Sequence, residues 1–127
     1  MTTHAAVWID HQEARIFHVQ ADGFDEATLH SPHRHIHRHP KGGTAEHNHP
    51  DDLRALFRDT ARALDGFDEI LVLGPSTAKV QFLSYVHDHD RAIEPKIVGS
   101  ETVDHPTDRQ LVAHVKQYFG MPAPRLR

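Results

Sequence analysis

The sequence contains no cysteine. Disulfide bonds, thiolate nucleophiles and the cysteine-containing zinc sites are therefore excluded, so that a metal ion would have to be held by His, Asp or Glu. No apolar run approaches the roughly 20 residues that cross a bilayer. The opening MTTHAAVWID also lacks the basic start and apolar stretch of a secretory signal. These absences predict a cytoplasmic protein that does not bind membranes.

The length of 127 residues suits one domain with a sizeable core. We expect residues 1–120 to form that domain and residues 121–127, MPAPRLR, to form a flexible basic tail. The sequence has no Gly-x-Ser-x-Gly elbow and no phosphate-binding loop motif. Hydrolases of those classes are therefore not expected.

Charge is distributed unevenly along the chain. The formal net charge is -4 with histidine neutral, which as a sum does not suggest a nucleic-acid-binding protein. Residues 27–45, however, contain three basic residues and no acidic one. Because this segment contributes +3 to a total of -4, the remaining residues carry -7. Its five histidines would add positive charge as the pH falls toward about 6.5.

Hydrophobic periodicity predicts an α/β fold. Apolar and alternating runs near residues 5–9 and 15–19 predict a hairpin with Asp-His-Gln-Glu as its turn, and a third extended segment should run from about Ala27 to His39. The further elements are a helix from Pro50 that stops at Gly66, a buried strand at Glu69–Leu73, a helix with Ser76 as N-cap, a strand over Lys96–Val103 and a helix from Thr107 to Gly120. The predicted order is β-β-β-α-β-α-β-α in a single domain with a mixed sheet.

The stretch HRHIHRHPKGGTAEHNH, residues 33–49, has the composition of an RNA-contacting segment. Its basic arm, Arg34–Thr44, offers Arg34, Arg38 and Lys41 to phosphates, and its imidazole rings can stack on unpaired bases. Gly42 and Gly43 permit close approach of the backbone. The alternative interpretation is a polar loop whose charges only keep it soluble.

Metal binding is the competing functional prediction. In an extended chain, side chains at i and i+2 lie on one face, so His35, His37 and His39 could share a zinc, nickel or copper ion. His47 and His49 repeat the His-x-His pattern after the glycines. A specific site needs at least three converging ligands with outer hydrogen-bonding support, which excess histidines do not guarantee.

Three segments in order resemble a known family: the hairpin AVWIDHQEARIFHV, the sequence HPKGGT before a long helix, and ILVLGPSTAKVQFLSYV. They are similar to the middle domain of the eukaryotic and archaeal class 1 peptide-chain release factors and of Pelota. The similarity spans nearly the whole chain. It implies a ribonuclease H-like fold.

The same resemblance implies a role in translation. In the release factors the corresponding arm ends in a Gly-Gly-Gln loop that enters the peptidyl-transferase centre and promotes hydrolysis of peptidyl-tRNA. Gly42 and Gly43 match the two glycines, but Thr44 stands at the glutamine position. A threonine hydroxyl is shorter than the amide and sits on a stiff β-branched stem, so it need not place the attacking water. We therefore expect at most weak peptidyl-tRNA hydrolase activity.

The resemblance thus predicts a ribosome- or tRNA-binding module that acts in rescue, stalling or dormancy. No DNA partner is expected, and docking would use the module's own surface, another protein or a second copy. Asp10, Asp104 and Asp108 invite comparison with the metal-binding carboxylates of ribonuclease H enzymes. Each is explained more simply as a turn or first-turn residue. Trp8 is predicted to be a core residue.

Overall fold

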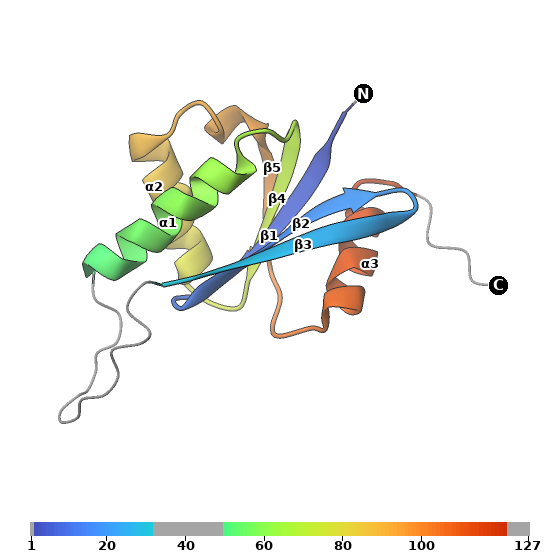
Figure 1. Ribbon diagram of the computed structural model, residues 1–127, viewed down its shortest axis with the longest axis horizontal. Coiled ribbons are helices and arrows are strands. Elements are labelled where there is room, and N and C mark those ends of the chain that lie inside the picture. The colour runs from blue at the N-terminus through green and yellow to red at the C-terminus, as the bar shows by residue number, and fades with distance from the viewer. Residues whose placement is uncertain (1, 32–49, 122–127) are drawn as a thin grey trace.

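Five strands form one mixed sheet in the order β3-β2-β1-β4-β5 (Figure 1). The structure is a computed structural model that describes residues 2–31 and 50–121. The elements are β1 (His4–Ile9), β2 (Glu13–Gln20), β3 (Gly23–His30), α1 (Pro50–Leu64), β4 (Glu69–Gly74), α2 (Ala78–His89), a short 3₁₀ helix (Glu94–Lys96), β5 (Ile97–Thr102) and α3 (Asp108–Tyr118). The predicted order of strands and helices is confirmed.

The two apolar runs form the centre of the sheet. β1 pairs with β4 in parallel, Val7 opposite Val72, and both strands are buried on both faces, as is usual for parallel strands at the centre of an α/β sheet. β2 and β3 continue the sheet as antiparallel hairpin strands on the other side of β1. The β1–β2 turn is built as predicted, since Asp10 Oδ1 accepts hydrogen bonds from the backbone N–H groups of Gln12 at 2.8 Å and Glu13 at 2.9 Å.

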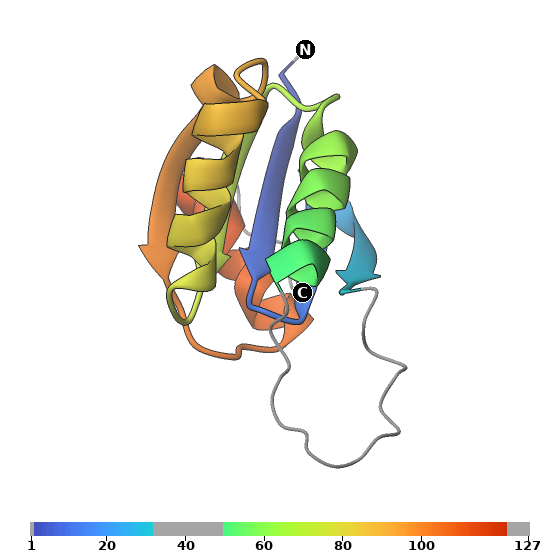
Figure 2. The same cartoon turned by 90° about the vertical axis from the view of Figure 1, so that its left-hand side faces the viewer.

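Helices cover both faces of the sheet, α1 and α2 on one face and α3 on the other (Figure 2). Successive side chains of a strand point to opposite faces. Ala5, Val7 and Ile9 therefore join the core under α1 and α2, whereas Ala6 and Trp8 join the core under α3. No described helix is both long and apolar enough to cross a membrane.

Two details of the sequence prediction were wrong. The third strand begins at Gly23 instead of near Ala27, because a tight turn pairs Gln20 with Gly23 directly; strand structure ends at His30. Residues 32–39 of the predicted segment lie outside the described residues. The N-cap of α2 is Thr77, not Ser76, and its side chain makes no capping hydrogen bond.

The last helix begins and ends as predicted. Thr107 and Gln110 form a capping box: the Gln110 backbone N–H donates to the Thr107 hydroxyl oxygen at 3.1 Å, and the Thr107 N–H donates to Gln110 Oε1 at 2.9 Å. Gly120 follows the helix with a φ of 72°, a conformation that favours glycine. The capping box and Gly120 thereby mark the two ends of α3.

Candidate nucleic-acid interface

The basic arm belongs to the part of the chain that joins β3 to α1. β3 ends and α1 begins at the same end of the molecule as the β1–β2 turn (Figures 1 and 2). This is the end at which the parallel strands β1, β4 and β5 have their carboxyl termini. Ligand sites of α/β sheets occur outside the carboxyl ends of strands, so the arm is attached where such sites are usual.

The point at which the chain leaves β3 is tied to the folded body. The Ser31 backbone N–H donates to the carbonyl oxygen of Gln12 at 2.9 Å. In the same turn, the His11 ring lies 2.9 Å, Nε2 to Oε1, from the Gln81 side chain of α2. The β1–β2 turn therefore connects β3 with α2 and provides an ordered base for the segment that follows Ser31.

The predicted contact residues themselves lie outside the described residues. These are the RNA-binding set Arg34, Arg38, Lys41, Gly42, Gly43 and Thr44 and the metal-binding set His35, His37, His39, His47 and His49. Their assignments stay predictions.

The described residues contain no group of three His, Asp or Glu side chains placed to hold a metal ion. The three carboxylates compared with ribonuclease H enzymes have separate structural partners. Asp10 accepts the turn hydrogen bonds, Asp104 Oδ1 lies 3.0 Å from His105 Nδ1, and Asp108 Oδ1 accepts from Arg15 Nη1 at 2.7 Å. Asp10 lies in a turn and Asp108 in the first turn of α3, as predicted, and the contact of Asp108 with Arg15 of β2 was not predicted.

A pocket of about 400 Å³ opens beside α3, at the carboxyl end of β5. It is lined by Val103, Asp104, His105, Pro106, Gln110, Leu111 and His114. Sequence reasoning missed this pocket because its lining residues, although they all lie within residues 103–114, form a pocket only in the folded arrangement of the loop and the first turns of α3. The capping box was the one sequence signal near it, since it placed Gln110 on the first turn of α3.

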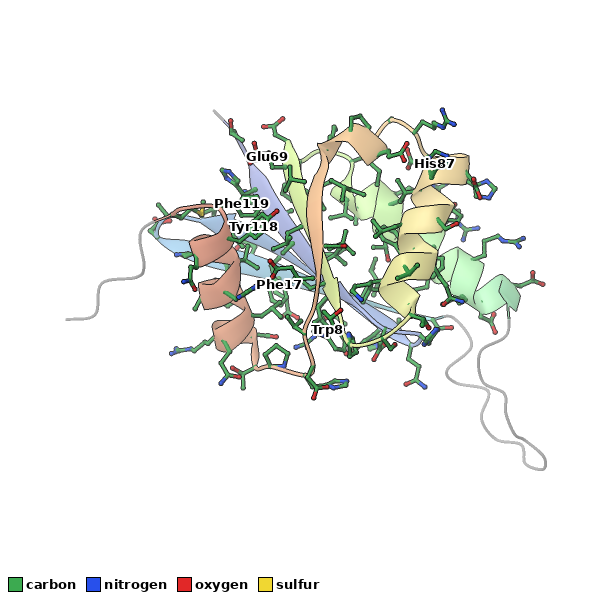
Figure 3. All side chains as sticks on the ribbon, turned by 180° about the vertical axis from the view of Figure 1, so that it is seen from behind. Trp8, Phe17, Glu69, His87, Tyr118 and Phe119 are labelled. Atoms are coloured by element: carbon green, nitrogen blue, oxygen red, sulfur yellow. The ribbon has the colours of Figure 1, made fainter. Side chains whose placement is uncertain are left out.

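Trp8 contacts the loop between β5 and α3 and is fully buried, as predicted. Trp8 Nε1–H donates to the Asp104 carbonyl oxygen at 2.8 Å, and the Trp8 and His105 ring centroids lie 5.0 Å apart. The Arg15 guanidinium carbon lies 4.6 Å from the centre of the Trp8 ring. Figure 3 labels Trp8 and Phe17, which both belong to the core on the α3 face.

One carboxyl group is perturbed at the opposite end of the sheet. The pKa of Asp68 is lowered from its ordinary value, chiefly because its carboxylate accepts the Thr3 backbone N–H at 2.9 Å and, secondly, the Thr3 hydroxyl at 3.2 Å. Thr3 precedes β1 and Asp68 precedes β4, so the contact ties the amino ends of the two central strands. Its place in the fold indicates a structural role.

No protein-family model matches the chain, and no curated protein matches it in sequence. Among solved structures, it is similar to Pelota from Thermoplasma acidophilum, with a TM-score of 0.64 and 23% identity over 91% of this chain and 32% of that protein. It is similar to Pelota from Archaeoglobus fulgidus, with a TM-score of 0.64 and 15% identity over 91% of this chain and 31% of that one. An archaeal translation termination factor, aRF1, matches with a TM-score of 0.55 and 10% identity over 91% of this chain and 34% of that one.

The chain therefore spans about a third of the length of these proteins. At such low identities the likeness concerns the fold alone. The mixed α/β domain predicted from the sequence is confirmed, and its structural neighbours include Pelota and an archaeal release factor, as the resemblance of the three segments suggested.

Proposed function

We propose that this chain is a translation-associated module that binds the ribosome or tRNA through the basic arm, without efficient peptidyl-tRNA hydrolysis. The observation that carries the proposal is the fold similarity across 91% of the chain to two Pelota proteins and to an archaeal translation termination factor. The sequence adds support at the tip of the arm, where Gly42 and Gly43 precede Thr44.

The charge distribution supports contact through the arm and not through the whole surface. Outside residues 27–45 the chain carries a formal charge of -7, because the total is -4 and the segment contributes +3. A polyanion is repelled by the body and attracted by the arm, so Arg34, Arg38 and Lys41 would approach it first. The arm would therefore set both the orientation and the salt dependence of binding.

Thr44 defines the proposed departure from a termination factor. Its hydroxyl reaches less far than a glutamine amide and is held on a β-branched stem, whereas its backbone N–H is retained. The module would occupy its site without placing the hydrolytic water well. Such binding suits rescue in company with another factor, stalling or dormancy.

The arm is tested by replacing Arg34, Arg38 and Lys41 with alanine in the full chain. We expect loss of ribosome co-sedimentation at moderate salt. Each lost phosphate contact should also lower the slope of log affinity against log salt for single-stranded RNA by about 0.7.

A matched control variant removes three positive charges from outside the arm. Arg54, Arg58 and Arg62 are exposed residues of α1, and their replacement by alanine also removes three positive charges. This control should retain co-sedimentation. Equal losses in the two variants would indicate nonspecific attraction and contradict a specific role of the arm.

A further inference from the structure

The pocket beside α3 has the size and lining of a small-molecule site. Its volume of about 400 Å³ lies within the usual range of ligand pockets, about 300–1,000 Å³. Val103 and Pro106 contribute apolar surface, whereas His105, His114 and Gln110 contribute hydrogen-bonding groups. Such a lining favours a ligand with apolar faces and polar edges.

The polar groups retain hydrogen-bonding capacity. His105 engages Asp104 through Nδ1, and His114 engages Glu101 through Nε2, so the second nitrogen of each ring has no hydrogen-bond partner among residues 2–31 and 50–121. Gln110 uses its amide oxygen for the capping box, and its amide nitrogen likewise has no partner in the described part of the chain. Ring nitrogens that accept or donate according to tautomer, together with an amide donor, match the edge of a heterocycle.

The charges at the pocket argue against an anion as the bound group. Asp104 lines the pocket, and Glu101 stands behind His114. The nearby guanidinium of Arg15 is engaged by Asp108 at 2.7 Å, so it does not supply a free positive charge. A neutral planar ring avoids the repulsion that a phosphate group would meet from these carboxylates.

The pocket is also held in shape before any ligand arrives. Trp8 is hydrogen-bonded to the Asp104 carbonyl oxygen and lies against the His105 ring, while the capping box fixes Gln110. A site with prearranged side chains loses little conformational entropy on binding. The loop from β5 to α3 lies at the same end of the molecule as the end of β3 and the start of α1 (Figures 1 and 2).

We propose that this pocket binds an unpaired nucleobase of the RNA whose phosphates the basic arm contacts. The inference rests on the proposed function for its choice of RNA as the partner. The base would lie against Pro106 between the two imidazoles, with its polar edge toward Gln110 and the free ring nitrogens. Base contacts carry little salt dependence, so the pocket and the arm would make separable contributions to RNA affinity.

The first test titrates the full chain with adenosine, guanosine, cytidine and uridine at fixed pH, with the imidazole proton signals as the readout. At least one nucleoside should shift the signals of His105 and His114. His87 is the matched control, because it is also exposed and paired with a carboxylate, Glu94, on another helix (Figure 3); its signal should not move. Shifts produced equally well by Nα-acetylarginine amide would indicate a site for a basic side chain and would overturn the proposal.

The second test measures binding of a single-stranded oligonucleotide to the His105→Ala/His114→Ala variant, with His87→Ala as control and circular dichroism to verify folding. We expect about a tenfold weaker affinity with an unchanged salt slope, the size expected for loss of one stacked base. If the double variant binds the oligonucleotide with normal affinity while the arm variant loses affinity, the proposal for the pocket would be overturned and the proposed function would stand. If nucleosides shift the His105 and His114 signals while the arm variant still binds ribosomes normally, the result would support the pocket and reject the proposed role of the arm.

Discussion

The two faces of the sheet are attached to their helices in different ways. Under α1 and α2 the apolar cluster is the larger one and includes an edge-to-face contact between Phe57 and Phe82, with ring centroids 5.6 Å apart. Under α3 the apolar cluster is smaller. Polar ties supplement it: Trp8 to Asp104, Arg15 to Asp108, and Lys116 to the Ala21 carbonyl oxygen at 3.1 Å.

This difference separates stability from positioning. Apolar burial stabilises roughly in proportion to area and tolerates small shifts, whereas hydrogen bonds require defined distances and angles. The ties of α3 join residues more than 90 positions apart in the chain. They fix α3 and its preceding loop to the sheet, so the face with the weaker apolar core is the one that holds a shaped pocket.

The largest expected loss of unfolding free energy comes from truncating the large buried aromatic side chain on each face of the sheet. Trp8 and Phe82 are both fully buried, and truncation of either to alanine should cost about 3–5 kcal/mol of unfolding free energy. Trp8→Ala also removes the hydrogen bond to Asp104, which adds about 1 kcal/mol. Urea denaturation should therefore rank Trp8→Ala as the more destabilising change, and only this change should abolish nucleoside binding. A larger loss in Phe82→Ala would show that the hydrogen bond from Trp8 to Asp104 contributes little to stability.

A smaller expected loss of stability tests how closely each face of the sheet is packed. A Cβ added at Gly74 would collide with the backbone carbonyl of Ile9, which cannot move without disturbing the central strands. A Cβ added at Gly99 would meet the hydroxyl of Tyr118, whose side chain is half-exposed and can turn aside. We expect Gly74→Ala to cost about 1–3 kcal/mol and Gly99→Ala less than about 1 kcal/mol. Thermal unfolding of the two variants measures the difference, and equal shifts would show that α3 is held as rigidly as β1.

The parts of the fold that were predictable carry their own local signals. The apolar runs at Ala5–Ile9 and Glu69–Leu73 identified the central strands, and Thr107 with Gln110 fixed the start of α3. The start of β3 was missed because this edge strand is exposed and contains Asp25 and Glu26, so its composition does not resemble that of a strand.

The candidate site was predictable only in part. Basic residues and glycines predict the arm from composition, and Arg34–Thr44 lie outside the described residues, so the arm stays a prediction. The capping box was the one sequence signal near the pocket, and it did not predict that His105 in the loop and His114 in the helix line the same pocket. The hydrogen bond of Trp8 to Asp104, which is distant in sequence, was likewise not predicted.

The smallest expected effect on stability concerns the hydrogen bonds between Asp68 and Thr3, which join the amino ends of the two central strands. Asp68 has a pKa below its ordinary value of 3.8, because its ionised form accepts hydrogen bonds from Thr3. A carboxyl group with a lowered folded-state pKa contributes stability above its unfolded pKa, and this contribution is lost as the pH falls through the folded value. The thermal midpoint of the wild-type chain should therefore include an acid-dependent decrease that begins near pH 4.

Asp68→Asn retains an acceptor oxygen but cannot ionise, so the variant should show a shallower decrease as the pH falls below about 4. Asp65→Asn provides the control, because Asp65 is a nearby exposed carboxylate at the end of α1. Since Asp68 lies at the amino ends of β1 and β4, nucleoside binding at neutral pH should be the same in both variants. An unchanged acid profile in Asp68→Asn would mean that the Thr3 contact does not favour the ionised carboxylate, and a loss of nucleoside binding would show that the two ends of the sheet are coupled.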